Sequence, residues 1–258
     1  RGGAGGVAGA ANVAQSAPDG YSLLLSSTGA FTISMHLTKL PYDPINDFTP
    51  ITQLVVNQFV LCLHPSLPAT SARQLIALAK SRRVEFTYGS AGTGGVSHLS
   101  GELFSSMTGV KLVHVPYRGS GPMTVDLLAG QVDMAFPAIA SLVPVIKAGR
   151  VRALAVTGAR RSFALPELPT MAEAGVAGYE ASAFWGLVGP AKLPRDIVAK
   201  INAAAHEALK ARDLRDAWIV QGNEPVSNTP KQFAAMMKAE AAKWGRILRT
   251  AGIRGENS

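Results

Sequence analysis

The sequence predicts an α/β protein with a mostly parallel sheet flanked by helices. Two observations support this prediction: short apolar runs of strand length recur along the chain, and segments with apolar residues at helical spacing lie between them. Strands that alternate with helices form parallel sheets, because each helix carries the chain back to the start of the next strand. With 258 residues, 47% hydrophobic and 16% charged, the chain can bury the core of one large domain or two lobes.

Strands are expected where apolar runs end in glycine, proline or small hydroxyl residues. The run at 21–28 indicates a buried strand, and the run at 131–136 shows period-two alternation at Val132, Met134 and Phe136. The predicted strands are 21–28, 84–90, 110–117, 131–136, 151–157 and 184–190.

Helices are predicted from apolar spacing and from residues that favour helix ends. Pro122 suits the first turn of a helix, and two pairs, Thr170 with Glu173 and Thr229 with Gln232, have the spacing of a capping box. The predicted helices begin near residues 30, 96, 122, 139, 195 and 230, and the last two are the longer helices that finish the chain.

Three loops rich in glycine and hydroxyl residues follow predicted strands, at 24–29, 89–95 and 116–122. Such loops lie at the carboxyl ends of parallel strands, where α/β proteins bind ligands, and the helix that follows offers unpaired N–H groups to an anion. Ser90, Thr93 and Ser97 add hydroxyl donors. The three loops together predict a small anionic ligand, although each loop alone is equally compatible with a tight turn.

The motifs of common enzyme classes are absent from the sequence. No phosphate-binding P-loop lysine, no G-x-S-x-G nucleophile elbow and no H-E-x-x-H metal motif occurs. His98 and Glu102 lie four residues apart on a predicted helix, and a hydrogen bond on the helix surface is the expected explanation. Arg118, beside Tyr117, is either a fork of donors for a carboxylate or a solvated loop residue.

Charge and cysteine content narrow the possible partners. The formal net charge of +8 is spread along the chain and aromatic residues make up 7%, whereas nucleic-acid-binding proteins usually gather basic residues and interleave aromatics. No nucleic-acid partner, metal or cofactor is therefore expected. The single cysteine, Cys62, lies in an apolar run and is expected to pack as a small hydrophobe.

Several motifs together resemble one known family. They are "PDGYSLLL", "LPYDPINDFTPI", "YGSAGTGGVSHLSGELF", "HVPYRGSGPMTVDLLAGQVDMAF", "LPELPTMAEAGVAGYE" and "FWGLVGPAKLP". In content and spacing, from residue 2 to about residue 252, the sequence is similar to the Bug family (TctC-type, tripartite tricarboxylate transporter) of extracytoplasmic solute receptors.

This resemblance implies a type II periplasmic-binding-protein fold, with two α/β lobes joined by a two-strand hinge near 59–64 and 184–190. Lobe 1 would contain residues 1–63 and 184–258, and lobe 2 residues 64–183. Relatives begin earlier, with a strand and a proline-glycine loop. The first lobe is therefore expected to lack its N-terminal strand and first helix, and the chain to begin in the loop after that helix.

The resemblance also implies a function without catalysis: a monomeric periplasmic receptor that captures a small mono-, di- or tricarboxylate between its lobes and delivers it to membrane permease subunits. No signal peptide is recognised in this sequence. The implied ligand-binding residues are Ser26, Ser27, Thr28, Ser90, Gly92, Thr93, Gly94, Tyr117, Arg118, Phe136 and Ala138.

Pro137 stands where relatives often carry an aspartate, which bears on the acid that fits. Two alternatives remain open from the sequence. One is a ligand-sensing effector or signalling module of the same bilobal fold, and the other is an enzyme on this scaffold.

Overall fold

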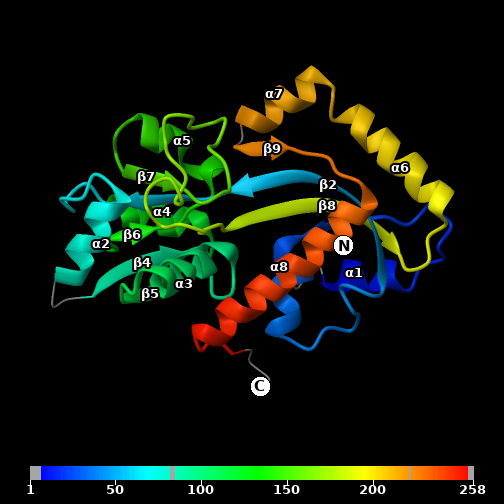
Figure 1. Ribbon diagram of the computed structural model, residues 1–258, viewed down its shortest axis with the longest axis horizontal. Coiled ribbons are helices and arrows are strands. Elements are labelled where there is room, and N and C mark those ends of the chain that lie inside the picture. The colour runs from blue at the N-terminus through cyan, green and yellow to red at the C-terminus, as the bar shows by residue number, and fades with distance from the viewer. Residues whose placement is uncertain (1–6, 82–84, 221, 255–258) are drawn as a thin grey trace. The chain divides into compact units, whose positions relative to one another are not determined.

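The computed structural model describes residues 7–81, 85–220 and 222–254, and it confirms the predicted α/β class (Figure 1). Val84, which begins one predicted strand, lies outside the described residues. The α-helices are α1 (Val7–Ala14), α2 (Ala72–Ser81), α3 (Val96–Thr108), α4 (Ser120–Leu128), α5 (Ile139–Lys147), α6 (Arg195–Ala208), α7 (Arg212–Val220) and α8 (Pro230–Thr250). The strands are β1 (Leu24–Ser27), β2 (Phe48–Gln58), β3 (Val60–Leu63), β4 (Phe86–Ser90), β5 (Leu112–Pro116), β6 (Met134–Ala135), β7 (Arg152–Val156), β8 (Ser182–Pro190) and β9 (Asn223–Pro225).

The chain forms two compact units. The first contains Arg1–Val56, Ala183–Trp218 and Glu224–Ser258, and the second contains Asn57–Ser182 and Ile219–Asn223. The boundaries fall inside β2, β8, α7 and β9. The strand order is β1-β8-β2-β9 in the four-stranded sheet and β5-β4-β6-β3-β7 in the five-stranded sheet, which belongs to the second unit.

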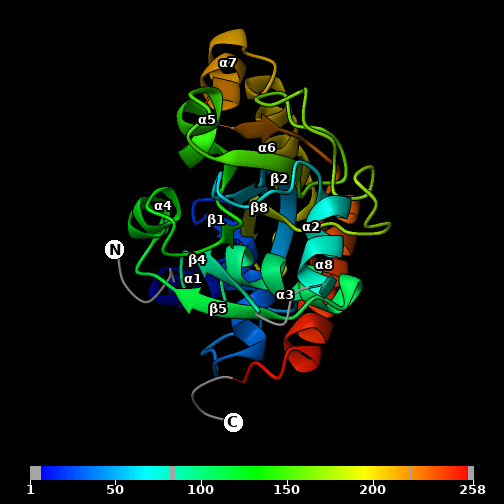
Figure 2. The same cartoon turned by 90° about the vertical axis from the view of Figure 1, so that its left-hand side faces the viewer.

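The five-stranded sheet is mixed rather than mostly parallel as predicted, because two of its four strand pairings are parallel and two are antiparallel. Strand β4 pairs in parallel with β5 and with β6, whereas β3 runs antiparallel to β6 and to β7. Strands β4 and β5 lie side by side in both views (Figure 1 and Figure 2). Since only β3 is reversed, the carboxyl ends of β5, β4 and β6 meet at one edge of the sheet.

Strand β6 differs from its predicted pattern. The expected alternation at 131–136 is wrong, because Met134 and Ala135 are both fully buried and so are Val132 and Phe136. The reason is that helices cover both faces of the strand: Ala135 lies in a cluster with Leu127 of α4, and Phe136 packs near Phe104 of α3. Cys62 on neighbouring β3 is likewise fully buried, and its packing as a small hydrophobe is confirmed.

Strand β1 is shorter and less buried than predicted. It covers only Leu24–Ser27, and Leu25 is 52% exposed while Tyr21 is 93% exposed. Within the part of the chain that the structure describes, β1 is an edge strand of its sheet and pairs only with β8, in antiparallel register. An edge strand has a sheet neighbour on one side only, which explains why the apolar run at 21–28 did not become a buried strand.

The first unit also contains a helix that was not predicted. Residues 7–14, expected to form a loop, form α1, whose sequence VAGAANVA is rich in alanine, the best helix former. Its Ala10 is buried in a cluster with Phe31, Phe184 and Met237. A π-helical turn at Gly29–Ile33 and a 3₁₀ turn at Ser34–His36 occupy the predicted short helix after β1.

Both predicted capping boxes form, but only one of them starts a helix. At α8, Thr229 and Gln232 form the reciprocal bonds of a capping box. Thr170 and Glu173 also exchange these bonds, at 2.8 and 3.1 Å, but only a turn follows, which Gly175 ends with a φ of +107°. Helix α7, which lies between the last two predicted helices, was not predicted at all.

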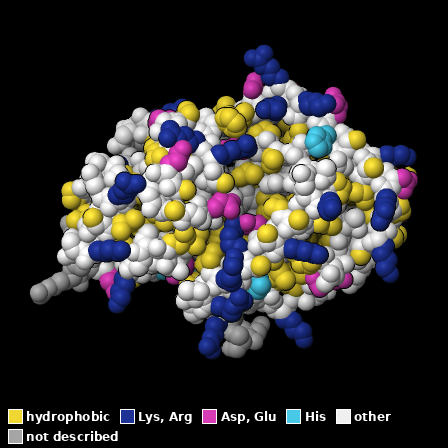
Figure 3. Space-filling view, viewed as in Figure 1, with side chains coloured by type: hydrophobic (Ala, Val, Ile, Leu, Met, Phe, Trp, Pro, Cys, Tyr) yellow, Lys and Arg dark blue, Asp and Glu magenta, His cyan; other side chains and the backbone are white. Residues whose placement is uncertain are grey.

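The protein carries a net positive charge, and its basic side chains are not gathered in one place on the face that Figure 3 shows. On the face shown in Figure 3, Lys and Arg side chains are spread among hydrophobic and polar groups. Among the described residues, no helix is long and apolar enough to cross a membrane.

Candidate functional site

The candidate site of the second unit lies where three parallel strands end. Strands β4, β5 and β6 are each followed by a short loop, at 91–95, 117–119 and 136–138, and then by α3, α4 and α5 respectively. Because β5, β4 and β6 are neighbours in the sheet, these loops share one edge. Most of the residues that the sequence predicted for the second lobe therefore lie on adjacent loops.

The three helices that start at this edge have no side-chain cap, although in α5 the Ser141 N–H donates to Ala138 O at 3.1 Å and Pro122 in α4 has no N–H. Their N-cap residues are Gly95, Gly119 and Ala138, and none of them caps its helix with a side chain. None of the three first turns contains an acidic residue. Uncapped N–H groups and the positive end of the helix dipole attract anions, so this edge is electrostatically suited to a negatively charged ligand.

The loop at 91–95 uses most of its own amide donors internally. The N–H groups of Ala91, Gly92 and Gly94 donate to Ser97 Oγ (2.9 Å), Ser90 Oγ (3.2 Å) and His98 Nδ1 (3.0 Å). The Gly95 N–H lies 3.4 Å from Gly92 O. Gly92 and Gly94 have φ angles of +140° and +76°, which only glycine adopts without strain. The loop is therefore rigid, and its glycines shape it rather than present their amides outward.

Two side chains at this edge keep their polar groups available. Thr93 is exposed, and among the described residues its N–H and hydroxyl have no hydrogen-bond partner. Arg118 is exposed and has no ion-pair partner in the part of the chain that the structure describes. Its loop is tied to the first, because the Tyr117 and Gly119 amides donate to Ser90 O and Ala91 O, at 3.0 and 3.2 Å.

Tyr117 and Ser90 make contacts inside the protein. The Tyr117 hydroxyl donates to Asp126 Oδ2 on α4, at 2.8 Å. Burial, together with the hydrogen bond to Asp126 and its charge, raises the pKa of Tyr117 to about 12. Ser90 is fully buried, with its Oγ 2.7 Å from His114 Nε2.

In the third loop, at 136–138, the Phe136 side chain points into the core, so mainly backbone groups remain at the sheet edge. The Phe136 side chain is fully buried and packs near Tyr88 and Phe104. Ala138 is half-buried at the start of α5 and forms a bridge with Phe59. The Pro137 carbonyl accepts from the Val60 amide at 3.0 Å, so this loop is fixed to β3.

The predicted contact between His98 and Glu102 is present, but its expected place on the helix surface is wrong, because both side chains are largely buried. His98 Nε2 lies 3.6 Å from Glu102 Oε1, and the two side chains are only 4% and 22% exposed. The His98 ring stacks on the His114 ring of β5, with centroids 3.8 Å apart. The Tyr88 hydroxyl donates to Glu102 Oε1 at 2.5 Å. Helix α3 thus turns this pair toward the sheet.

In the first unit, two of the predicted hydroxyl residues, Ser26 and Ser27, end β1, and Thr28 follows it. Ser26 and Thr28 are buried and bond to β8: Ser26 Oγ donates to Gly186 O at 2.9 Å, and Thr28 Oγ1 accepts from the Phe184 amide at 2.7 Å. Ser27 is half-buried and accepts from the Ala30 amide at 3.4 Å, a long contact. Of the three, Ser27 has the hydroxyl that is most available to a ligand.

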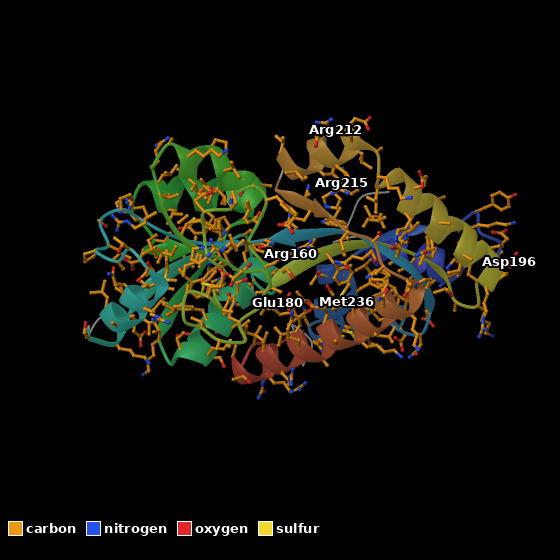
Figure 4. All side chains as sticks on the ribbon, turned by 45° about the horizontal axis from the view of Figure 1, so that its top comes forward. Arg160, Glu180, Asp196, Arg212, Arg215 and Met236 are labelled. Atoms are coloured by element: carbon orange, nitrogen blue, oxygen red, sulfur yellow. The ribbon has the colours of Figure 1, made fainter. Side chains whose placement is uncertain are left out.

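A cavity of the first unit has none of the predicted residues in its lining. Its volume is about 210 Å³. Its lining is His206, Leu209, Lys210, Arg215, Pro225, Val226 and Ser227. Figure 4 shows Arg215, like Arg212, on α7. No local pattern in the sequence indicated this cavity, because its basic residues come from α6, from the segment that follows α6 and from α7, and their packing is not visible in the apolar spacing.

A metal-dependent mechanism has no candidate site here: among the described residues, no group of three His, Cys, Asp or Glu side chains is placed to hold a metal ion. The residues that sequence reasoning missed are His114, Asp126 and the first-turn residues of α4 and α5. The parallel strand pattern was the signal that could have indicated them, since it brings the ends of β4, β5 and β6 together.

The family model described as "Tripartite tricarboxylate transporter family receptor" (TctC) matches residues 1–253. The protein BugT of Bordetella pertussis is 35% identical over 256 residues, which are 98% of this chain and 78% of that protein. The family resemblance predicted from the motifs is therefore confirmed.

Several solved structures, among them a periplasmic binding protein, have the same fold. The R. palustris protein Rpa4515, solved with adipate, is 36% identical, with a TM-score of 0.82 over 99% of this chain and 86% of that chain. The periplasmic binding protein BugD has a TM-score of 0.77 at 31% identity, over 99% of this chain and 86% of its own. MatC from Rhodopseudomonas palustris, with bound malate, has a TM-score of 0.75 at 32% identity, over 95% and 85%.

Proposed function

We propose, from the premise that this chain belongs to the TctC family of tripartite tricarboxylate transporter receptors, that it is a periplasmic receptor for a small organic carboxylate. The edge formed by the carboxyl ends of β4, β5 and β6 would bind the carboxylate in the second unit. The two-lobe capture implied by the resemblance stays a prediction.

The observation that carries this proposal is the set of three helix N-termini without side-chain caps at one sheet edge. A buried carboxylate is costly unless every oxygen is hydrogen-bonded, and first-turn amides supply such donors without a mobile side chain. The absence of acidic residues from these first turns leaves the positive potential uncompensated. Thr93 and Arg118 add a hydroxyl and a guanidinium at the same edge.

Two ligands bound by similar proteins suggest the chemical class. Adipate is present in the structure of Rpa4515 and malate in that of MatC, and both are dicarboxylates. We therefore place dicarboxylates of four to six carbons first among the candidate ligands. The apolar stem and second carboxylate of such a ligand would need contacts beyond this edge, for which Ser27 in the first unit is a candidate.

Delivery to a membrane permease and residence in the periplasm are part of the same proposal. They are supported by family membership and by the periplasmic binding proteins among the similar structures. Because binding requires no chemical step, the proposed activity is reversible binding without turnover.

Isothermal titration calorimetry with a panel of mono-, di- and tricarboxylates tests the proposal. We expect at least one dicarboxylate to bind with a Kd in the micromolar range, as a few charge-assisted hydrogen bonds can support. Analysis of the ligand after incubation should show no conversion. If no member of the panel binds, or if a bound acid is converted, the receptor proposal is wrong.

A matched pair of variants separates the site from general charge attraction. Arg118→Gln and Arg150→Gln each remove one exposed positive charge from the second unit, but only Arg118 lies at the candidate edge. We expect Arg118→Gln to raise the Kd about tenfold and Arg150→Gln to leave it unchanged within about twofold. Equal effects of the two substitutions would exclude a direct contact by Arg118.

A further inference from the structure

The stacked pair of His98 and His114 contacts the segment at 90–95 at two residues, Gly94 and Ser90. His98, in the first turn of α3, accepts the Gly94 N–H on Nδ1 at 3.0 Å. His114, on β5, places Nε2 at 2.7 Å from Ser90 Oγ. The two rings are nearly parallel, with an angle of 13° and a centroid distance of 3.8 Å. One compact group thus supports both ends of the loop.

The main chain fixes the protonation of His98. An amide N–H can only donate, so Nδ1 of His98 must carry a lone pair, and in the neutral ring the proton is then on Nε2. Nε2 faces the Glu102 carboxylate at 3.6 Å. Protonation of Nδ1 would replace this acceptor with a donor opposite the Gly94 N–H and break the contact.

The position of His98 resembles a capping box. In that motif the third residue of a helix accepts a backbone N–H just before the helix. Here an imidazole takes the place of the usual Glu or Gln, and the amide it holds is that of Gly94, one residue before the N-cap Gly95. A Gln would offer an oxygen acceptor that takes up no proton, whereas the Nδ1 acceptor of a histidine is lost when that nitrogen is protonated.

We propose that His98 and His114 are positioning residues that hold the loop at 90–95 in its ligand-binding form, and that the His98 contact holds only while its Nδ1 is unprotonated, so that carboxylate binding weakens in acid. This inference rests on the proposed function, because the loop belongs to the proposed carboxylate site. Neither ring touches the ligand in this role. They act through Gly94 and Ser90.

The protein around His98 and His114 disfavours a positive charge on His114. The titratable groups that face the pair are Tyr88 from β4 and Glu102 from α3, with Tyr179 behind Tyr88. Burial and the neighbouring His98, partly offset by Glu102, lower the pKa of His114 to about 4. Two rings stacked at 3.8 Å also cannot both be charged without strong repulsion.

Two substitutions at His98 separate its acceptor from its ring. His98→Asn keeps an acceptor oxygen near the position of Nδ1 but cannot be protonated. His98→Phe keeps a flat ring that can stack on His114 but has no acceptor for the Gly94 N–H. A thermal melt of each variant confirms that it is folded before binding is measured.

The first test needs no ligand. Long-range ¹H–¹⁵N spectra of the wild-type protein at pH 7 should show Nδ1 of His98 unprotonated and Nε2 protonated. Hydrogen exchange of the Gly94 amide at the same pH should be about tenfold faster in His98→Phe than in wild type, and close to wild type in His98→Asn. A proton on Nδ1, or equal exchange in the two variants, would overturn the proposal.

The second test measures the Kd of a dicarboxylate by calorimetry from pH 8 to pH 4. The carboxylic acid itself takes up a proton in this range, equally for every variant, so His98→Asn serves as the reference. We expect wild-type affinity to fall more steeply than that of His98→Asn, and His98→Phe to bind about tenfold more weakly at pH 7. Identical pH profiles for wild type and His98→Asn would refute the pH coupling. If no dicarboxylate binds even to the wild type, the proposed function fails, while the ligand-free spectra and exchange rates still decide the role of His98.

Discussion

Gly101 of helix α3 lies directly against the aromatic ring of Tyr88 on strand β4. A Cβ atom on Gly101 would be 2.6 Å from Cζ of Tyr88, closer than two carbon atoms can approach. Tyr88 is fully buried, so its ring cannot turn outward to make room. The absence of a side chain at Gly101 therefore lets α3 approach the sheet and brings His98 beside His114.

We predict that Gly101→Ala lowers the free energy of unfolding by about 1–3 kcal/mol, as expected for overpacking in a filled core. Chemical denaturation measures this change. Gly9→Ala in α1 is the control, because nothing lies within 4 Å of a Cβ at that position. It should be neutral or stabilise by up to about 1 kcal/mol, since alanine favours a helix. A stability loss of the same size in both variants would show that contact with Tyr88 is not the cause.

The helix and strand signals were strongest where the sequence is periodic or has clear ends. Helix α3 begins at Val96 and α8 at Pro230, as predicted, because apolar spacing and the Thr229 cap are local features. The burial of β1 and the pattern of β6 were predicted wrongly. Whether a strand lies at the edge of a sheet or is covered by helices on both faces depends on its neighbours, which no local pattern encodes.

In the candidate site, too, local features were predicted correctly and features that depend on distant neighbours were not. The sequence located the loops after β4 and β5, because glycine-rich turns between a strand and a helix are visible in it. It did not indicate which polar groups are turned inward. Ser90 contacts His114, which is 24 residues away, and Thr28 contacts Phe184, which is 156 residues away. Such partners follow from sheet pairing, so the role of each hydroxyl could not be read from its own segment.

Acid should destabilise the protein between about pH 6.5 and pH 4 through His114. Burial, with the neighbouring His98, lowers the pKa of His114 from 6.5 to about 4, so in this range the unfolded chain binds more protons than the folded protein. The free energy of unfolding should therefore fall as the pH is lowered through this window. After allowance for its partial exposure, we expect a loss of about 2 kcal/mol.

Urea denaturation at a series of pH values measures this dependence, and His114→Phe is the test variant. Phenylalanine keeps a ring against His98 but does not titrate, so the variant should be less stable at pH 7 and show a shallower slope between pH 6.5 and 4.5. An unchanged slope would assign the acid sensitivity to other groups. Burial raises the pKa of Glu102, but the hydrogen bond from Tyr88 and the nearby His98 lower it by more, so Glu102 acts mainly below that range.

Tyr117→Phe should affect stability more than ligand binding. The Tyr117 hydroxyl already donates to Asp126 Oδ2 at 2.8 Å, so removal of this bond should cost about 1 kcal/mol. Carboxylate affinity should stay within about threefold of wild type, because the ring and its loop remain in place. Calorimetry and denaturation of the same sample compare the two effects. A tenfold loss of affinity with unchanged stability would instead indicate that the hydroxyl contacts the ligand.

Ser27 and Thr28 are neighbours with opposite expected roles in the first unit. Thr28 Oγ1 accepts the Phe184 amide at 2.7 Å in a buried position, so Thr28→Val would leave this N–H without a partner. We expect Thr28→Val to lower the free energy of unfolding by about 2 kcal/mol. Ser27 is half-buried, and among the described residues its hydroxyl makes a single long hydrogen bond, so Ser27→Ala should leave stability within about 0.5 kcal/mol of wild type.

Binding measurements on the same two variants complete this comparison. If the Ser27 hydroxyl donates to a carboxylate, Ser27→Ala should raise the Kd about five- to tenfold, while Ser27→Thr, which keeps the hydroxyl, should bind nearly as wild type. Denaturation curves identify any loss of affinity in Thr28→Val that comes from partial unfolding. Should Ser27→Ala and Ser27→Thr bind equally well, the first unit would contribute no hydroxyl from this loop to the ligand.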